Sequence, residues 1–158
     1  MTNIELVAWD VYGTIIDSYH DESSDIDNPL KLRPGALEIL TKINSKNIVQ
    51  ITISDGNPEN LKNSLKEAGI SNWRDYFFDI CSIMVPGQQK DIENMINYYN
   101  NELGSSLSFD IKKTLVIGDN YDIDLALAKK QGCQILHVPI LKKYGVNPLP
   151  VDEIRSFT

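Results

Sequence analysis

The chain has 158 residues, 42% hydrophobic and 23% charged, with a formal net charge of -7 at pH 7. This length fits one domain around a buried sheet, so we predict a single domain over residues 1–158. The acidic balance argues against binding to nucleic acid or to an anionic membrane, because both need basic side chains that neutralise phosphates.

The start of the chain, residues 1–5, lacks a basic segment followed by a long apolar stretch. No apolar run approaches the roughly 20 residues that cross a bilayer, so we expect a cytoplasmic protein. The two cysteines, Cys81 and Cys133, fit small buried apolar residues better than a disulfide.

Short apolar runs rich in β-branched residues alternate with amphipathic segments along the chain. The predicted strands are 4–9, 48–53, 77–84, 114–117 and 134–138, and the predicted helices are 34–45, 58–68, 88–103 and 123–131. Prolines near helix starts and glycines after helix ends support these boundaries. The alternation predicts an α/β fold of three layers, in which helices cover both faces of a mostly parallel sheet of about five strands.

Residues 17–33 interrupt this alternation. The stretch 17–29 holds five acidic side chains and no Lys or Arg. We interpret 17–33 as an acidic flap or loop exposed to solvent.

Polar side chains stand where three of the predicted strands end. Asp10 opens the sequence Asp-Val-Tyr-Gly-Thr after the first strand, Ser54-Asp55-Gly56 follows the second, and Gly118-Asp119 follows the fourth. Ligands of open α/β sheets bind at the carboxyl ends of the strands, so these residues are expected to face a common crevice. Lys90 opens the third predicted helix.

These residue types suit attack on an electrophile. The carboxylate of Asp10 can act as a nucleophile and form an ester that water later hydrolyses. The hydroxyl of Ser54, with the backbone amides of Asp55 and Gly56, can bind an anionic oxygen. Lys90 can neutralise the nucleophile and the charge that develops during transfer. Thr14 is interpreted as structural.

These four polar motifs are the Asp10 loop, Ser54-Asp55-Gly56, Lys90 and Gly118-Asp119. Their order resembles that of the motifs in the haloacid dehalogenase (HAD) superfamily of hydrolases, and the resemblance covers about residues 4–138. The resemblance implies a Rossmann-like fold in which Asp10 is the nucleophile, and catalytic roles for Tyr12, Ser54 and Lys90. It also implies Mg²⁺, which favours oxygen ligands. The expected protein ligands are Asp10, the Tyr12 backbone carbonyl and Asp119, with Asp124 or Asp122 completing or supporting the set. The short segment before Pro34 implies a member without a large cap domain.

One residue departs from the phosphatases of this family, which carry a second aspartate two positions after the nucleophile. Here that residue is Tyr12, whose phenol has a reference pKa of about 10 and is poorly matched to proton exchange near neutrality. The same sequence, Asp-x-Tyr-Gly-Thr, resembles the 2-haloacid dehalogenase branch, whose halide needs no proton. That branch, however, has a large cap domain and lacks a Gly-Asp metal motif such as Gly118-Asp119 of this chain.

Three hypotheses remain open from the sequence. The favoured one is a Mg²⁺-dependent phosphatase with an aspartyl-phosphate intermediate, slowed by Tyr12. The alternatives are a non-catalytic binding or regulatory protein of this fold, and a metal-independent dehalogenase-like hydrolase. A phosphorylated small molecule or protein is the expected substrate, and a homodimer that covers the crevice is a further hypothesis. His20 is predicted to be solvated and His137 to be packed.

Overall fold

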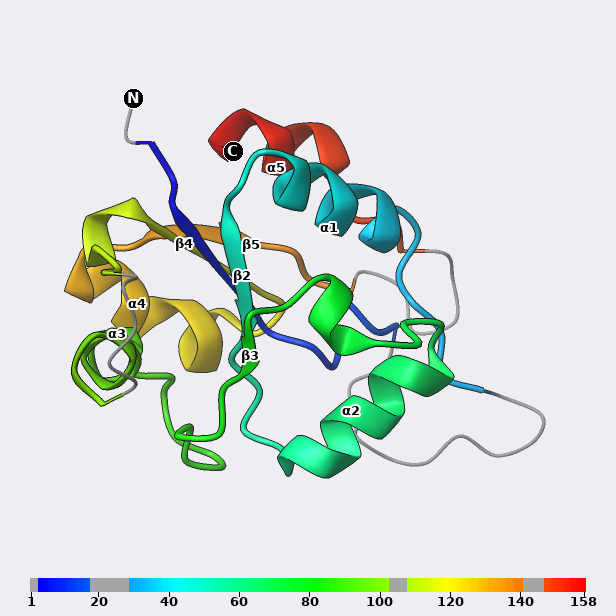
Figure 1. Cartoon of the computed structure of the whole chain (residues 1–158), viewed down its shortest axis with the longest axis horizontal. Coiled ribbons are helices and arrows are strands. Elements are labelled where there is room, and N and C mark those ends of the chain that lie inside the picture. The colour runs from blue at the N-terminus through cyan, green and yellow to red at the C-terminus, as the bar shows by residue number, and fades with distance from the viewer. Residues whose placement is uncertain (1–2, 18–28, 103–107, 141–146) are drawn as a thin grey trace.

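A computed structural model of the chain describes residues 3–17, 29–102, 108–140 and 147–158 (Figure 1). Its centre is a sheet of five parallel strands in the order β3-β2-β1-β4-β5. The strands are β1 (Leu6–Trp9), β2 (Val49–Thr52), β3 (Asp79–Ile80), β4 (Thr114–Gly118) and β5 (Gln134–His137). The central position of β1 places the residue that follows it, Asp10, between the ends of two neighbouring strands.

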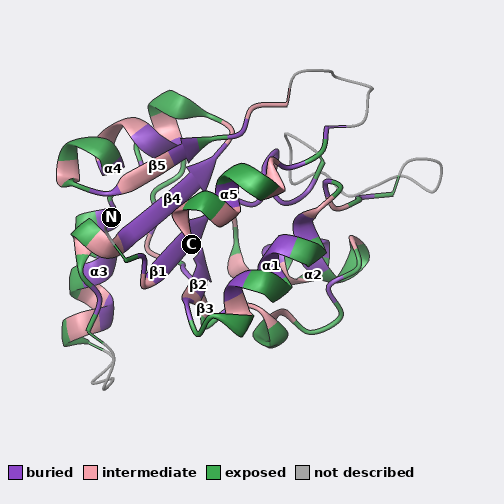
Figure 2. Ribbon diagram, turned by 90° about the horizontal axis from the view of Figure 1, so that it is seen from above, coloured by how far each residue is buried: buried purple, intermediate pink, exposed green. Residues whose placement is uncertain are grey.

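Helices cover both faces of this sheet, which gives the three layers that the sequence predicts. The α-helices are α1 (Ala36–Ser45), α2 (Pro58–Glu67), α3 (Ile92–Asn101), α4 (Ala126–Gln131) and α5 (Val151–Phe157). Apolar residues of α1, α2 and α5 pack with Val7 and Trp9 on one face, and those of α3 and α4 pack with Leu6 and Ala8 on the other. The central strands β1 and β4 are accordingly buried on both sides (Figure 2), as parallel sheets require, whereas the edge strand β5 is partly exposed.

The predicted strands all exist, but their lengths differ from the expectation. The third, predicted over 77–84, is only the two residues of β3, because it lies at the sheet edge and pairs with β2 alone. After β3 the chain leaves the sheet and turns at Gly87. The free cysteines Cys81 and Cys133 are both buried, as expected.

Three predicted helices do not begin where the sequence suggests. The helix expected from residue 34 begins at Ala36. The helix expected from residue 88 begins at Ile92, where the side chain of Asp91 caps its first turn, and its expected end at Leu103 lies outside the described residues. The helix expected from Ile123 begins as a π-helical turn, η3 (Tyr121–Leu125), and continues as α4. Helix α5 and the 3₁₀ turns η1 (Trp73–Asp75) and η2 (Ile111–Lys113) were not predicted.

The ends of the acidic segment 17–33 are tied together next to β1. The Asp17 amide donates to the Lys31 carbonyl (2.8 Å), Ile16 and Leu32 form an antiparallel bridge, and the Arg33 amide donates to the Ile15 carbonyl (2.8 Å). Residues 18–28, which hold His20 and most of the acidic side chains, lie outside the described residues. The described residues form no large cap domain. In the described part of the chain, no helix is both long and apolar enough to cross a membrane.

A buried amide connects the sheet to α1. Gln50 in β2 is 1% exposed; its side-chain carbonyl accepts from Trp9 Nε1 (2.9 Å), and its side-chain amide donates to the Leu40 carbonyl (2.9 Å) and to Asn44 Oδ1 (2.8 Å). Buried polar groups are normally hydrogen-bonded. Here the Trp9 indole and the two α1 acceptors all bond to the single side chain of Gln50. Gln50 therefore fixes α1 against the face of the sheet.

The substitution Gln50→Leu should lower the free energy of unfolding by about 1–3 kcal/mol, because it leaves the buried indole N–H of Trp9 without its partner. Urea denaturation measures this change. The exposed Gln88 provides the control Gln88→Leu, which should stay within about 0.5 kcal/mol of the wild type. Equal stabilities for the two variants would contradict the structural role of Gln50.

Candidate active site

Asp10 leaves β1 at the centre of the sheet and is buried. Its backbone amide donates to the Ile117 carbonyl of β4 (2.9 Å), so the ladder holds the residue in place. Both carboxylate oxygens are engaged: Oδ2 accepts from Thr14 Oγ1 (2.9 Å), and Oδ1 lies 2.5 Å from Lys90 Nζ. Asp10 is thus a fixed carboxylate at the carboxyl edge of the sheet, where the sequence predicts it.

Lys90 lies between two carboxylates. Its Nζ is 2.5 Å from Asp10 Oδ1 and 2.7 Å from Asp124 Oδ1, and all three side chains are at most 10% exposed. The residue stands in the loop before α3 and does not open the helix as predicted. Its backbone amide donates to the Ile123 carbonyl of η3 (2.9 Å), which fixes the loop against that turn. The structure therefore brings Lys90 to Asp10 from a loop, and not from the first turn of a helix as predicted.

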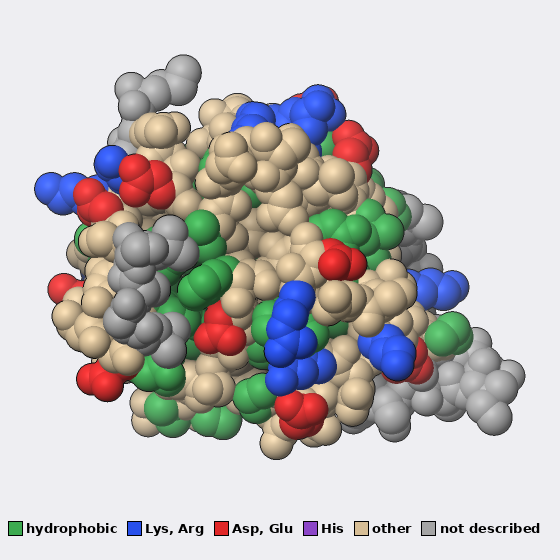
Figure 3. Space-filling view, in the orientation of Figure 1, with side chains coloured by type: hydrophobic (Ala, Val, Ile, Leu, Met, Phe, Trp, Pro, Cys, Tyr) green, Lys and Arg blue, Asp and Glu red, His purple; other side chains and the backbone are tan. Residues whose placement is uncertain are grey.

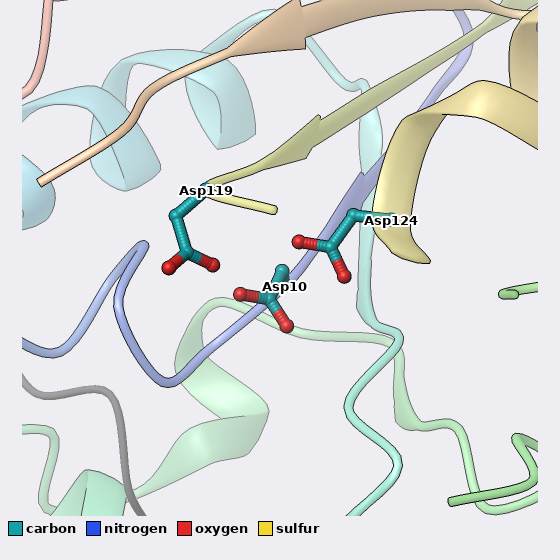
Figure 4. A group of neighbouring side chains, drawn as sticks. All are labelled: Asp10, Asp119 and Asp124. Atoms are coloured by element: carbon teal, nitrogen blue, oxygen red, sulfur yellow. The ribbon is translucent and has the colours of Figure 1, made fainter. Parts of the chain in front are cut away.

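Asp119 and Asp124 complete the carboxylate cluster with Asp10. The side chains of the three residues point toward one another (Figure 4), with one oxygen of each within 4.8 Å of the others. Asp119 directly follows β4, and Asp124 comes from η3, where its Oδ2 accepts from the Asn120 amide (3.0 Å). π-helical turns occur often at functional sites. Asp122, the other candidate of the sequence, is exposed and is not a member of this cluster.

Two glycines make room for these carboxylates. A Cβ on Gly13, which has φ +83°, would collide with the carboxylate of Asp119. A Cβ on Gly118 would lie 2.5 Å from Asp124 Oδ2 and 2.6 Å from Asp124 Cβ. Real side chains do not approach so closely, so both positions require glycine.

The cluster has three carboxylates and one ammonium group, and this imbalance shifts their proton affinities. Burial and the neighbouring Asp10 and Asp124 carboxyl groups raise the pKa of Asp119 to about 8. Burial and Asp10 also raise the pKa of Asp124, because Lys90 offsets only part of the negative charge. For Lys90 burial lowers the pKa, but the two adjacent carboxylates outweigh it and leave the pKa above its ordinary value.

A divalent cation fits this donor set. Crowded carboxylate oxygens are the ligands that Mg²⁺ prefers, and a cation would relieve the repulsion that raises the pKa of Asp119. Asp10, Asp119 and Asp124 are positioned to hold it. A ligand role for the Tyr12 backbone carbonyl, which lies in the same loop as Gly13, stays a prediction.

The predicted anion-binding residues form another part of the same cavity, which has a volume of about 550 Å³. Ser54 is buried, and its Oγ accepts from the Gly56 amide (3.2 Å), which leaves the hydroxyl proton for a ligand. Asp55 Oδ2 accepts from the Gly87 amide (3.3 Å). Asp10, Ser54, Asp55, Gly56, Lys90, Asp119 and Asp124 all line this cavity.

Tyr12 lines the cavity with its ring, but its hydroxyl is directed toward α2. The hydroxyl donates to Ser64 Oγ (2.8 Å). The phenol proton is thus used within the protein. The role of Tyr12 in the reaction stays a prediction.

Several contacts were not foreseen from the sequence. Thr14, interpreted as structural, touches Asp10 directly and lies 3.5 Å from Asp119 Oδ1. Buried Arg33 donates to the carbonyls of Gly13 (3.4 Å), Val138 (2.6 Å) and Asn147 (2.8 Å). The sequence around Arg33 carries no signal of this role.

The prediction of a packed His137 was wrong. The residue is exposed, because it is the last residue of β5, at the edge of the sheet. Its Nε2 lies 2.8 Å from the Asp119 carbonyl, and its ring contacts that of Tyr121 edge-on. His137 therefore contacts the backbone of Asp119, one of the three clustered aspartates.

Known structures with this fold include several hydrolases. An uncharacterised protein from Listeria monocytogenes serotype 4b is 21% identical, with 93% of this chain and 88% of that chain covered and a TM-score of 0.63. A predicted phosphoglycolate phosphatase from Haemophilus somnus 129PT is 14% identical, with coverage of 98% and 92% and a TM-score of 0.66. At these identities the likeness shows the fold alone.

The L-2-haloacid dehalogenase from Xanthobacter autotrophicus has the same fold, at 15% identity, with 97% of this chain and 87% of that chain covered and a TM-score of 0.63. Phosphatase-type and dehalogenase-type relatives are thus both structural neighbours. No curated protein sequence matches the chain.

A sequence model of haloacid dehalogenase-like hydrolases matches residues 19–132, more than half of the chain. The matched region contains Ser54, Lys90, Asp119 and Asp124, and Asp10 precedes it. The parallel sheet and its structural neighbours agree with this match. The chain belongs to the haloacid dehalogenase-like hydrolases.

Proposed function

We propose that this hydrolase is a Mg²⁺-dependent phosphatase that acts through an aspartyl-phosphate on Asp10. The observation that carries the proposal is the cluster of Asp10, Asp119 and Asp124, in which Lys90 bridges Asp10 and Asp124. Such a cluster concentrates negative charge beside the nucleophile and suits a cation that neutralises a phosphoryl group. Hydrolysis of a carbon–halogen bond does not need a cation, because no phosphoryl group has to be neutralised.

Asp10 performs the covalent step. One of its carboxylate oxygens forms a bond to phosphorus while the bond between phosphorus and the ester oxygen breaks, and the leaving group departs with that electron pair. Water then attacks phosphorus, which releases inorganic phosphate and restores the Asp10 carboxylate. The water proton goes to solvent or to the departed oxygen.

The other residues bind and orient the phosphoryl group. Lys90 Nζ, beside Asp10 Oδ1, neutralises the nucleophile and the oxygens of the transferred group. Ser54 donates its hydroxyl to a phosphoryl oxygen, together with the neighbouring amide of Asp55, while the Gly56 amide donates to Ser54 Oγ and orients that hydroxyl. Bound Mg²⁺ would supply additional neutralisation of the phosphoryl oxygens.

Tyr12 limits the rate of this reaction. Because its hydroxyl donates to Ser64, it is not directed at a leaving group. General acid–base catalysis contributes about 10²- to 10⁴-fold, so a slow phosphatase is expected. The same feature keeps a non-catalytic binding protein as the second candidate function.

The expected substrate is a phosphorylated small molecule or a phosphorylated protein segment. On the face seen in Figure 3, Lys and Arg side chains are interspersed with Asp and Glu and form no continuous basic stripe. This mixture supports the proposal that nucleic acid is not a substrate. A homodimer and a cytoplasmic location are also proposed; the first is tested by the mass of the protein in solution.

Mg²⁺ should stabilise the fold through the carboxylate cluster. At about 100 times its Kd a ligand adds about 2.7 kcal/mol, which corresponds to a rise in Tm of roughly 5–10 °C for a chain of this size. Thermal unfolding with and without Mg²⁺ measures it. Asp119→Asn should lose the rise and, without metal, should be more stable than the wild type, because the substitution removes a partly buried carboxylate that its neighbours repel.

The matched control is Asp122→Asn, since Asp122 is exposed and outside the cluster. It should retain the full Mg²⁺ effect. An unchanged wild-type Tm at all Mg²⁺ concentrations would remove the metal from the proposal.

Hydrolysis of 4-nitrophenyl phosphate tests the reaction itself. The wild type should release phosphate only with Mg²⁺, and Asp10→Asn should fall to background. Tyr12→Asp should raise kcat by up to about 10²-fold, because it restores an acid–base carboxylate. Metal-independent halide release from a 2-haloacid, without phosphate release, would favour the dehalogenase. Mg²⁺ binding without any turnover, in the wild type and in Tyr12→Asp, would favour the binding protein.

The hydrogen bond between Tyr12 and Ser64 predicts a structural effect of the phenol. Tyr12→Phe and Ser64→Ala should each lower the free energy of unfolding by about 1 kcal/mol, and the double variant should lose less than the sum. Phosphate release by Tyr12→Phe should stay within about threefold of the wild type. A loss of more than about 10²-fold in kcat would show that the phenol serves as the acid or base.

A further inference from the structure

The cavity beside Asp10 contains one carboxylate that the proposed reaction does not use. Its lining has four carboxylates, those of Asp10, Asp55, Asp119 and Asp124, and a single cation, Lys90. Three of these carboxylates form the cluster described above, and Asp55 lies outside it. The lysine and a bound divalent cation would together neutralise the cluster. The negative charge of Asp55 would then remain without a neutralising cation in the cavity.

Asp55 is held at the cavity by its loop. It lies between buried Ser54 and the first residues of α2, is half-buried, and accepts a hydrogen bond from the Gly87 amide on the opposite loop (3.3 Å). None of the ion pairs of the described residues involves Asp55. Its negative charge is therefore not compensated by a described side chain.

The rest of the described lining offers no cation to an anionic leaving group. Apart from the charged residues, its members are uncharged: Tyr12, Ser54, Gly56, Asn57, Pro86, Gly87, Asn120 and Ile123. The amino end of α2 is also occupied, because Asn57 Oδ1 accepts from the Glu59 amide (2.9 Å) and the Asn60 amide (3.4 Å). A second anionic group of a substrate would face Asp55 and uncharged surfaces.

We propose that Asp55 is a specificity-determining residue, by which the cavity favours phosphate monoesters whose leaving group carries a protonated amine or no charge. Leaving groups with a carboxylate or a second phosphate are disfavoured. The inference rests on the proposed function in one respect: the phosphoryl group occupies the Asp10 end of the cavity. Repulsion by Asp55 then acts on whatever the phosphoryl group is attached to.

The proposal is tested by binding, without any turnover. Two phosphonates of similar length, 2-aminoethylphosphonate and 3-phosphonopropionate, differ in the charge of the far end. Their dissociation constants are measured by calorimetry in the presence of Mg²⁺. One unit charge at about 4 Å changes binding roughly fivefold even in water-like surroundings. We expect the amine to bind about tenfold more tightly than the carboxylate.

Variants of Asp55 assign the preference to this side chain. Asp55→Asn should reduce the ratio of the two dissociation constants to less than about threefold, and Asp55→Lys should invert it. The control Asp152→Asn makes the same change of net charge on α5, at a side chain that is 98% exposed and outside the cavity lining. Its ratio should equal that of the wild type.

Each outcome bears on one of the two proposals. Equal binding of the phosphonates to the wild type, a ratio unchanged in Asp55→Asn, or no binding of either compound at millimolar concentration overturns the role of Asp55. The expected ratios without hydrolysis of 4-nitrophenyl phosphate leave the role of Asp55 standing and remove the phosphatase. With hydrolysis, kcat/KM for O-phosphoethanolamine should exceed that for 2-phosphoglycolate by about tenfold, and this excess should shrink in Asp55→Asn.

Discussion

The site depends on one buried ammonium group shared by two carboxylates. Lys90 contacts Asp10 from the centre of the sheet and Asp124 from the π-helical turn. A buried charge is costly unless it is paired, so neither carboxylate could be placed there without this lysine. The pairing also joins three segments that are far apart in sequence: the loop after β1, the loop before α3, and η3. The geometry of the candidate site and its local stability thus rest on the same contacts.

This arrangement leaves negative charge in excess, and the excess is what makes the site suited to a cation. One ammonium cannot neutralise three carboxylates, and the raised pKa of Asp119 reflects the remainder. Gly13 and Gly118 keep the carboxylates close, since a side chain at either position would push one of them away. The fold therefore maintains repulsion that a ligand can relieve, which links binding to stability.

Sequence patterns predicted the sheet and four of the five main helices, because buried parallel strands are short apolar runs and helices carry clear start and stop residues. Asp10, Ser54 and Asp119 were found for the same reason, as polar residues directly after such runs. The order of motifs along the chain indicated Lys90, but it did not show that Asp91 caps α3 and so leaves Lys90 in the loop before the helix. The contacts of Thr14, Arg33 and His137 could not be read from the sequence, since each joins positions that only the folded chain brings together.

Arg33 has a consequence for how this architecture can vary. Its guanidinium binds the Val138 and Asn147 carbonyls, which flank residues 141–146, and its own backbone closes the segment 17–33 against Ile15. The residues on either side of 141–146 and the ends of the segment 17–33 are thus held in place by Arg33 and the residues next to it. Longer insertions between such anchors cost little loop-closure entropy. Evolution could exchange these segments for larger ones and acquire new substrates while the carboxylates around Lys90 keep their positions.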